Sequence, residues 1–142
     1  MSEADNKLLV RKFIEEIVNT GDTGRLHEFV SADFRDLNDR SGRIAGIEGC
    51  REHILGVRTT YPDLHLTIEE QIAEGDLVAT LVTMTGTHRG EWPPGAKPTN
   101  KPVRMTGVNI DRVREGRIVE HGGAANELAA FMEIGLIRFG HE

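Results

Sequence analysis

The residues whose types suit chemistry gather in the stretch from Gly116 to Leu128. Its first half alternates like a short strand and carries Glu120 and His121 on opposite faces. Asn126 then begins a helix, since it is a favoured N-cap residue before an apolar repeat. A strand that carries Glu and His and ends at a polar residue can present these side chains to an enclosed space. His121 titrates close to neutral pH, so this stretch suits acid–base chemistry.

The same stretch has plainer interpretations, which the sequence leaves open. The predicted alternation places Ile118, Glu120 and Gly122 on one face and Val119, His121 and Gly123 on the other. If the face of Glu120 points inward, this buried carboxylate needs a partner, and His121 is a surface residue. Asn126 serves equally well as an ordinary helix cap.

Other positions are candidates for contact with a substrate. Arg104 could anchor a carboxyl or phenolate group, and Asn109, on the opposite face of the same predicted strand, could donate a hydrogen bond. Both could instead face solvent or an oligomer surface. Trp92 lies in a long loop rich in proline and glycine, where its ring suits a cavity lid or an interface. Asp36 could border a pocket mouth, and the core or pocket wall is expected to include Phe13, Ile17 and Met84.

Apolar periodicity predicts the elements that position these residues. Helices are expected over 7–18, 23–30 and 46–60, and Pro62 prevents the third from continuing. Strands are expected over 64–73, 77–88, 101–114 and 117–125, with an edge or short strand over 31–37 and a final helix over 126–137. Helices followed by neighbouring antiparallel strands indicate a single α+β domain over residues 1–142.

The composition of the chain and the motifs it lacks disfavour several classes of function. A net charge of −6 disfavours nucleic-acid and anionic-membrane partners. No apolar run can span a bilayer and no signal pattern begins the chain, so a cytoplasmic location is expected. The histidines lack metal-ligand spacing and no nucleotide, flavin or haem motif occurs, so we expect neither metal nor cofactor. Cys50 lies near His53, but a small core residue is the favoured interpretation over a nucleophile.

Motifs along nearly the whole chain resemble the SnoaL-like polyketide cyclase family. They comprise the helix over 4–20, the segment Tyr61-Pro62-Asp63-Leu64, the glycine-led strand over 107–113 and the closing pattern over 116–128. The resemblance implies a cystatin-like α+β barrel, in which a curved antiparallel sheet wraps around N-terminal helices and leaves an internal apolar cavity. It also implies a large aromatic polyketide substrate and no bound cofactor.

Two positions depart from the family pattern. The cyclases carry an Asp at position 126 that is taken as the acid or base of an aldol ring closure, and here it is Asn126. An amide cannot transfer that proton, but it can donate a hydrogen bond to an enolate or phenolate oxygen. The cyclases commonly carry Trp at position 122, so Gly122 would open space in the cavity. Asn126 from this comparison, with His121 and Asn109 from their residue types and places on the strands, are the candidate catalytic residues.

The missing carboxylate favours, narrowly, the branch of the family that hydroxylates the anthracycline skeleton. There the pocket would stabilise a substrate anion that reacts with molecular oxygen, and a separate reductase could supply electrons. Aldol cyclisation of a polyketide ester is the alternative reaction, and a non-catalytic binding module is the alternative class. Substrate contacts are expected from Arg104, Glu120, Gly122, Trp92, Met84, Phe13, Ile17 and Asp36.

The long strands carry apolar side chains on both faces. Val78, Val82 and Met84 oppose Leu77, Ala79 and Leu81. One of these sets must point away from the cavity, where it would expose an apolar patch to water. A two-fold homodimer with sheet packed on sheet would bury both copies of that patch, and we expect this assembly.

Overall fold

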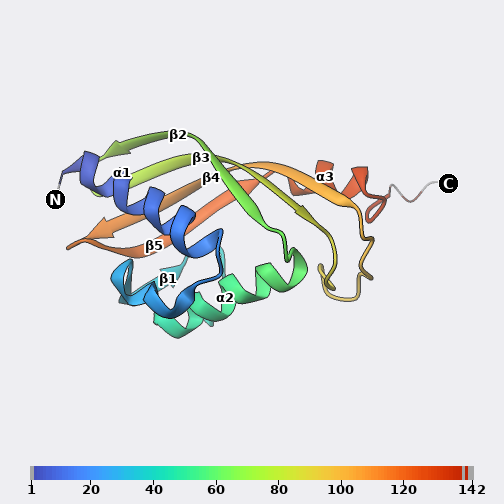
Figure 1. Cartoon of the computed structure of the whole chain (residues 1–142), viewed down its shortest axis with the longest axis horizontal. Coiled ribbons are helices and arrows are strands. Elements are labelled where there is room, and N and C mark those ends of the chain that lie inside the picture. The colour runs from blue at the N-terminus through green and yellow to red at the C-terminus, as the bar shows by residue number, and fades with distance from the viewer. Residues whose placement is uncertain (1, 139, 141–142) are drawn as a thin grey trace.

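The computed structural model describes residues 2–138 and 140 of the chain, and it is an α+β structure built on one five-stranded sheet (Figure 1). The elements are α1 (Glu3–Lys12), η1 (Phe13–Val18), η2 (Thr23–Glu28), β1 (Val30–Asp36), α2 (Gly46–Thr60), β2 (His65–Glu74), β3 (Leu77–Thr87), β4 (Pro102–Arg114), β5 (Arg117–Ala125) and α3 (Glu127–Glu133). The strand order is β1-β5-β4-β3-β2. The N-terminal helices and α2 lie on one side of the sheet, and α3 lies at one end of it.

The sequence predicted the bounds of α2, whereas the first helix begins at Glu3 instead of near residue 7 and the last helix is shorter than expected. Ser2 and Asp5 form a capping box at the start of α1, which continues into the π-helical η1. Helix α2 covers the predicted residues Gly46–Thr60, and Tyr61 follows it directly before Pro62. The last helix is shorter than predicted, because α3 ends at Glu133 rather than near Ile137.

The structure confirms the α+β fold that the family resemblance implied, but its sheet is not wholly antiparallel. Strands β2 to β5 pair antiparallel in chain order, but β1 pairs parallel with β5. The sheet is therefore mixed, and it ends in the two edge strands β1 and β2 instead of closing. Parallel pairing is possible here because α2 and three further strands separate β1 from β5 in the chain.

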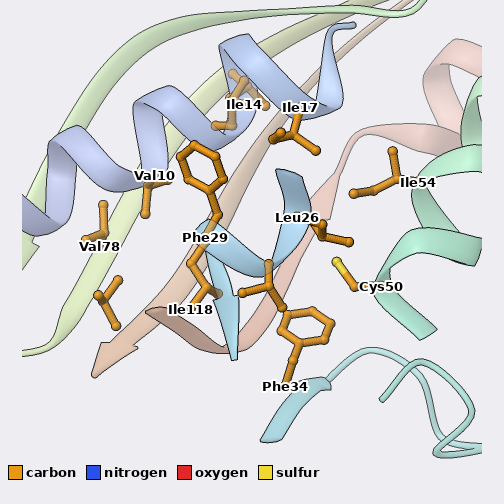
Figure 2. Packing of buried hydrophobic residues seen from close by; sticks show 13 residues of the cluster. Val10, Ile14, Ile17, Leu26, Phe29, Phe34, Cys50, Ile54, Val78 and Ile118 are labelled. Carbon is orange, nitrogen blue, oxygen red and sulfur yellow. The ribbon is translucent and has the colours of Figure 1, made fainter. Parts of the chain in front are cut away.

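The inner face of the sheet meets the helices and holds the core. On β4, Val103, Met105 and Val113 are buried, whereas Arg104 and Val108 on the other face are exposed, which confirms the predicted alternation. One buried cluster joins α1, η1, η2, β1 and α2 to the sheet, and Figure 2 shows its side chains. A second cluster joins the end of α2 and the strand β4 to α3.

A β-bulge corrects the predicted alternation of β5. Val113 pairs with Ile118, but Arg112 pairs with Glu120, so Val119 is an extra residue. Ile118 is in the buried core, and His121 faces the same side two pairs further along. The prediction that Ile118 shares a face with Glu120 was therefore wrong, since the bulge turns every later side chain to the opposite face.

No helix among the described residues is long and apolar enough to cross a membrane.

Candidate active site

The inner face of the sheet carries a buried carboxylate–histidine pair. Asp111 of β4 and His121 of β5 lie directly opposite each other, and Nδ1 of His121 is 2.7 Å from Oδ1 of Asp111. The Asp111 side chain is 3% exposed and that of His121 is 28% exposed. The carboxylate thus lies in the interior, whereas the imidazole is partly exposed to solvent.

Further ionisable groups surround this pair from β1 and α2. Asp36, the last residue of β1, pairs with His121 in the parallel register. Cys50 and His53 lie on α2, and the charge of Asp36 acts to raise the pKa of both side chains. The prediction that Asp36 borders the site is consistent with this arrangement, although its role stays a prediction.

The surroundings of His121 favour its protonated form. Burial by itself lowers the pKa of His121, but the charge of Asp111, the hydrogen bond to that carboxylate and the charge of Asp36 outweigh burial. The net result is a pKa above the ordinary value for histidine. His53 behaves in the opposite way, because burial and the neighbouring charge of His121 lower its pKa.

Cys50 is not a nucleophile in this arrangement. Burial and the charges of Asp36 and Asp111 raise the pKa of the Cys50 thiol to about 12. The thiol therefore stays protonated near neutral pH and packs as a small apolar group in the core. This confirms the interpretation of Cys50 as a core residue.

Asn109 lies beside the pair on the same face. It is opposite Gly123, and a Cβ atom built on Gly123 would lie 3.1 Å from Oδ1 of Asn109. Gly107 and Gly123 contribute no side chains to this part of the inner face. Asn109 is also the diagonal neighbour of His121 across the strand pair, which places their Cα atoms roughly 7–8 Å apart.

Asn126 is separated from this group. It precedes α3 as predicted, but its side chain does not cap the helix. Instead Oδ1 of Asn126 accepts a hydrogen bond from the main-chain N–H of Thr106 at 2.8 Å. Asn126 is five residues after His121 in the chain, about 15 Å in extended conformation. The amide continues the strand pairing between β5 and β4, and it lies outside the group around His121.

Three more candidates lie on the outer face of the sheet. Glu120 accepts hydrogen bonds from Arg112 at 2.8 Å and Arg35 at 2.7 Å, so this carboxylate has surface partners. Arg104 is exposed opposite Thr85, and Gly122 is opposite the exposed Ile110. All three belong to the outward set of their strands, so none of them lies on the face of His121. Arg104 instead lines a separate pocket of about 390 Å³ beside Asp63 and Glu133. Their contacts with a substrate stay predictions.

The remaining candidates are distant from His121 or belong to the packed core. Trp92 is 48% exposed and lies in the loop after β3. That strand ends at Thr87, nine residues or about 30 Å beyond Val78, the partner of Asp111. Ile17 is fully buried, and Phe13 packs against Phe29 with ring centroids 6.3 Å apart. Met84 packs with the second cluster at the α3 end of the sheet.

Asp111 is the member of the candidate site that sequence reasoning missed. The strand 101–114 alternates, so Asp111 was identifiable as a member of the apolar face of Met105, Asn109 and Val113. A carboxylate on such a face is costly unless it is paired, which is a usable signal. The sequence did not indicate that His121 is this partner, because a simple hairpin turn would place Asp111 opposite Glu120.

No group of His, Cys, Asp and Glu side chains within residues 2–138 and 140 is arranged to hold a metal ion.

The chain is similar in sequence and structure to a known family. A family model described as SnoaL-like polyketide cyclase matches residues 8–134. The structure of IdmH from Streptomyces antibioticus, described as a "putative polyketide cyclase", is 30% identical with a TM-score of 0.77, over 92% of this chain and 98% of its own. AclR from Streptomyces galilaeus, described as a "putative hydroxylase", is 25% identical with a TM-score of 0.79, over 99% of this chain and 87% of its own.

A further structure shows the likeness of the fold. TsrD from Streptomyces laurentii has a TM-score of 0.84 and 23% identity, over 96% of this chain and 99% of its own. A search of curated proteins found no match to the chain.

Proposed function

This chain belongs to the SnoaL-like polyketide cyclase family, as its motifs predict, and we propose that it closes a ring in an aromatic polyketide by an intramolecular aldol reaction. The observation that carries the proposal is the hydrogen-bonded pair of Asp111 and His121 on the inner face. An aldol closure begins with removal of a proton from a carbon next to a carbonyl group, and this pair suits that step.

His121 is the proposed general base. When its Nδ1–H donates to Asp111, the lone pair of Nε2 is the one available to a substrate. The buried carboxylate fixes this tautomer and stabilises the imidazolium that forms on proton uptake. The raised pKa of His121 makes it a stronger base than an isolated histidine, which favours attack on a weakly acidic C–H bond.

Asn109 is the proposed hydrogen-bond donor to the enolate oxygen. It lies diagonally opposite His121 on the same inner face, and Gly107 and Gly123 leave the face bare around it. A carbonyl oxygen near the Asn109 amide would place the adjacent carbon toward the imidazole. The enolate carbon then attacks a second carbonyl group of the same molecule, and His121 returns its proton to the new alkoxide, so the step needs no further reagent.

Hydroxylation is the second candidate, favoured by the likeness to AclR. It would use the same carbanion, which adds molecular oxygen to give a hydroperoxide. Cleavage of the O–O bond to an alcohol and water then consumes two electrons and two protons, which a separate reductase would supply. The sequence-based preference for this reaction depended on Asn126, and Asn126 lies away from the Asp111–His121 pair. Aldol cyclisation is therefore the function we favour.

Deuterium exchange tests the shared first step. The protein is incubated in D₂O with an aromatic β-keto ester, and incorporation at the carbon between the carbonyl groups is followed by NMR. We expect His121→Gln to slow exchange by about 100-fold or more. Thr83→Val, which removes a hydroxyl group on the outer face, is the control and should leave the rate unchanged.

The same experiment separates the candidates. Exchange in the wild type followed by a ring-closed product supports cyclisation, whereas oxygen-18 in the product under labelled oxygen gas supports hydroxylation. Binding of the ester with no exchange above background would leave only the non-catalytic binding module. An unchanged exchange rate in His121→Gln would refute the assigned base.

A further inference from the structure

Tyr61 lies between α2 and the strands and is the only tyrosine in the chain. Its ring packs against β3 because residue 86 is glycine, where a Cβ atom would lie only 3.0 Å from Cβ of Tyr61. The residue is 4% exposed, in the cluster with Met105 of β4 and Phe131 of α3. The ring is therefore enclosed by three separate elements.

The hydroxyl group of Tyr61 is buried and has no hydrogen-bond partner within the described part of the chain. Buried tyrosine hydroxyl groups usually have such a partner, because leaving a polar group unpaired in an apolar interior is unfavourable. Phenylalanine would fill the same space without that penalty. Packing alone does not account for the hydroxyl group, so its partner is to be sought in a ligand.

The surroundings define what that ligand carries. Burial, and then the charge of Glu127, raise the pKa of Tyr61, so the hydroxyl group keeps its proton and acts as a donor. The cluster around the ring is apolar and includes Leu64, Val103 and Ile134, and the buried His88 ring lies 6.1 Å from the Tyr61 ring between centroids without bonding its hydroxyl group. An apolar ligand that bears an acceptor oxygen would match both features.

We propose that Tyr61 is a substrate-binding residue whose hydroxyl group donates a hydrogen bond to a carbonyl oxygen at the end of the polyketide far from His121. The choice of ligand rests on the proposed function. Met105, beside Tyr61 in the cluster, is six residues before Asp111 on β4, about 20 Å of extended strand. Two contacts this far apart exceed the length of four fused rings, so they suit a substrate that carries an extended chain beyond its rings, and they would orient it along the strand.

Matched ligands and matched variants test the proposal. The probes are an anthraquinone carboxylate and the corresponding anthracene carboxylate, which differ only in the two ring carbonyl groups, and binding is measured by calorimetry. We expect Tyr61→Phe to weaken anthraquinone binding about tenfold, which corresponds to the loss of one hydrogen bond. It should leave anthracene binding unchanged and leave the melting temperature equal or higher, because the removed hydroxyl group has no partner in the protein.

Thr83→Val is the control, since it removes a hydroxyl group that does have a partner, Glu69, at 3.0 Å on the outer face. It should lower the melting temperature and leave both affinities unchanged. Equal anthraquinone affinity in the wild type and Tyr61→Phe would overturn the proposal. So would a fall in the melting temperature of Tyr61→Phe as large as that of Thr83→Val.

A second readout uses the single tyrosine directly. Protein labelled with carbon-13 at the tyrosine ring carbon that bears oxygen gives one resonance, and anthraquinone carboxylate should shift it while anthracene carboxylate shifts it much less. An equal shift with both probes would count against a hydrogen bond. These binding tests do not depend on His121, so the Tyr61 proposal can stand if deuterium exchange fails, and the reverse also holds.

Discussion

At the scale of single residues, the hydrogen bond between His121 and Asp111 helps to set the protonation of His121. The imidazole is partly buried, which alone would favour its neutral form, and two carboxylates reverse that preference. A histidine in such surroundings is protonated over a wider pH range than a free one, and it is also a stronger base once deprotonated.

Asp111→Asn should shift the pH dependence of proton abstraction to lower pH. The wild-type rate is expected to rise as His121 loses its proton, with a midpoint above the ordinary value of about 6.5. The amide removes the charge of Asp111, so burial becomes the dominant influence and lowers the pKa of His121. The plateau rate should fall as well, since the base is weaker and its tautomer is no longer fixed.

The check is a pH–rate profile for deuterium exchange together with an NMR titration of His121. Asp33→Asn makes the same change at an exposed position of β1, and its profile should match the wild type. A midpoint that stays in place in Asp111→Asn would contradict the assigned role of the carboxylate.

The same shift predicts how stability depends on pH. The pKa of His121 is higher in the folded protein than in the unfolded chain, where it is about 6.5. Protonation therefore favours the folded state: the contribution is complete below the unfolded pKa and is lost as pH rises through the folded pKa. Urea unfolding across this range should show a decline in the free energy of unfolding that His121→Gln lacks. If the free energy of unfolding changed with pH in the same way in both proteins, the raised pKa of His121 would be contradicted.

Asn126→Ala is expected to affect stability and to spare catalysis. The substitution removes the hydrogen bond from Thr106 to Oδ1 of Asn126, at a cost of about 0.5–1.5 kcal/mol. The exchange rate should stay within about twofold of the wild type, because the amide is about 15 Å along the strand from His121. Loss of most of the exchange activity would restore Asn126 as a candidate catalytic residue.

At the scale of elements, the pair of strands β4 and β5 owes its shape to glycine and to the bulge. A side chain at Gly123 would overlap the carbonyl oxygen of Val108, and one at Gly107 would lie 2.9 Å from the carbonyl oxygen of Ala124. The two strands therefore approach each other more closely than larger residues would permit. The bulge at Val119 then turns His121 toward Asp111.

Gly123→Ala should destabilise the protein by about 1–3 kcal/mol, because the added methyl group meets backbone atoms that cannot move away independently. Gly56→Ala is the matched control in α2, where an added Cβ atom meets nothing within 4 Å. It should stabilise the protein by about 0.5–1 kcal/mol, since alanine favours a helix over glycine. Thermal and urea unfolding measure both changes, and equal effects of the two variants would contradict the close approach of the strands.

At the scale of the whole molecule, the outer face of the sheet carries an apolar strip formed by Ile72, Leu77, Ala79, Leu81, Val108 and Ile110. Ile72 is 71% exposed, and Val108 and Ile110 are each 41% exposed. These residues lie on neighbouring strands β2, β3 and β4, so the strip is continuous across the sheet. A contiguous apolar surface of this kind is typical of an interface.

We propose that two copies pack their outer strips face to face as a homodimer. Light scattering at micromolar concentration should give twice the chain mass of 15.7 kDa. Ile110→Lys introduces a charge into the strip and should yield monomers. Leu128→Lys makes the same change on α3, where the residue is 58% exposed outside the strip, and should leave the dimer intact. A monomeric wild type would refute the proposal.

The sequence by itself determined the elements whose signals are local. The bounds of α2, the antiparallel order of β2 to β5 and the alternation along β4 follow from residue periodicity, from Pro62 and from the glycine turns. The family followed in the same way, since its motifs lie within those elements. Of the candidate site, His121, Asn109 and Asp36 were recognisable by residue type.

Only the tertiary structure decided which side chains meet. A simple hairpin turn at Glu115-Gly116 would pair Asp111 with Glu120, and the single extra residue Val119 pairs it with His121 instead. The parallel pairing of β1, which brings Asp36 to His121, joins segments far apart in the chain. Both pairings depend on packing over the whole sheet. Side chains alternate between the two faces of a strand, so one inserted residue reverses the face of every residue after it.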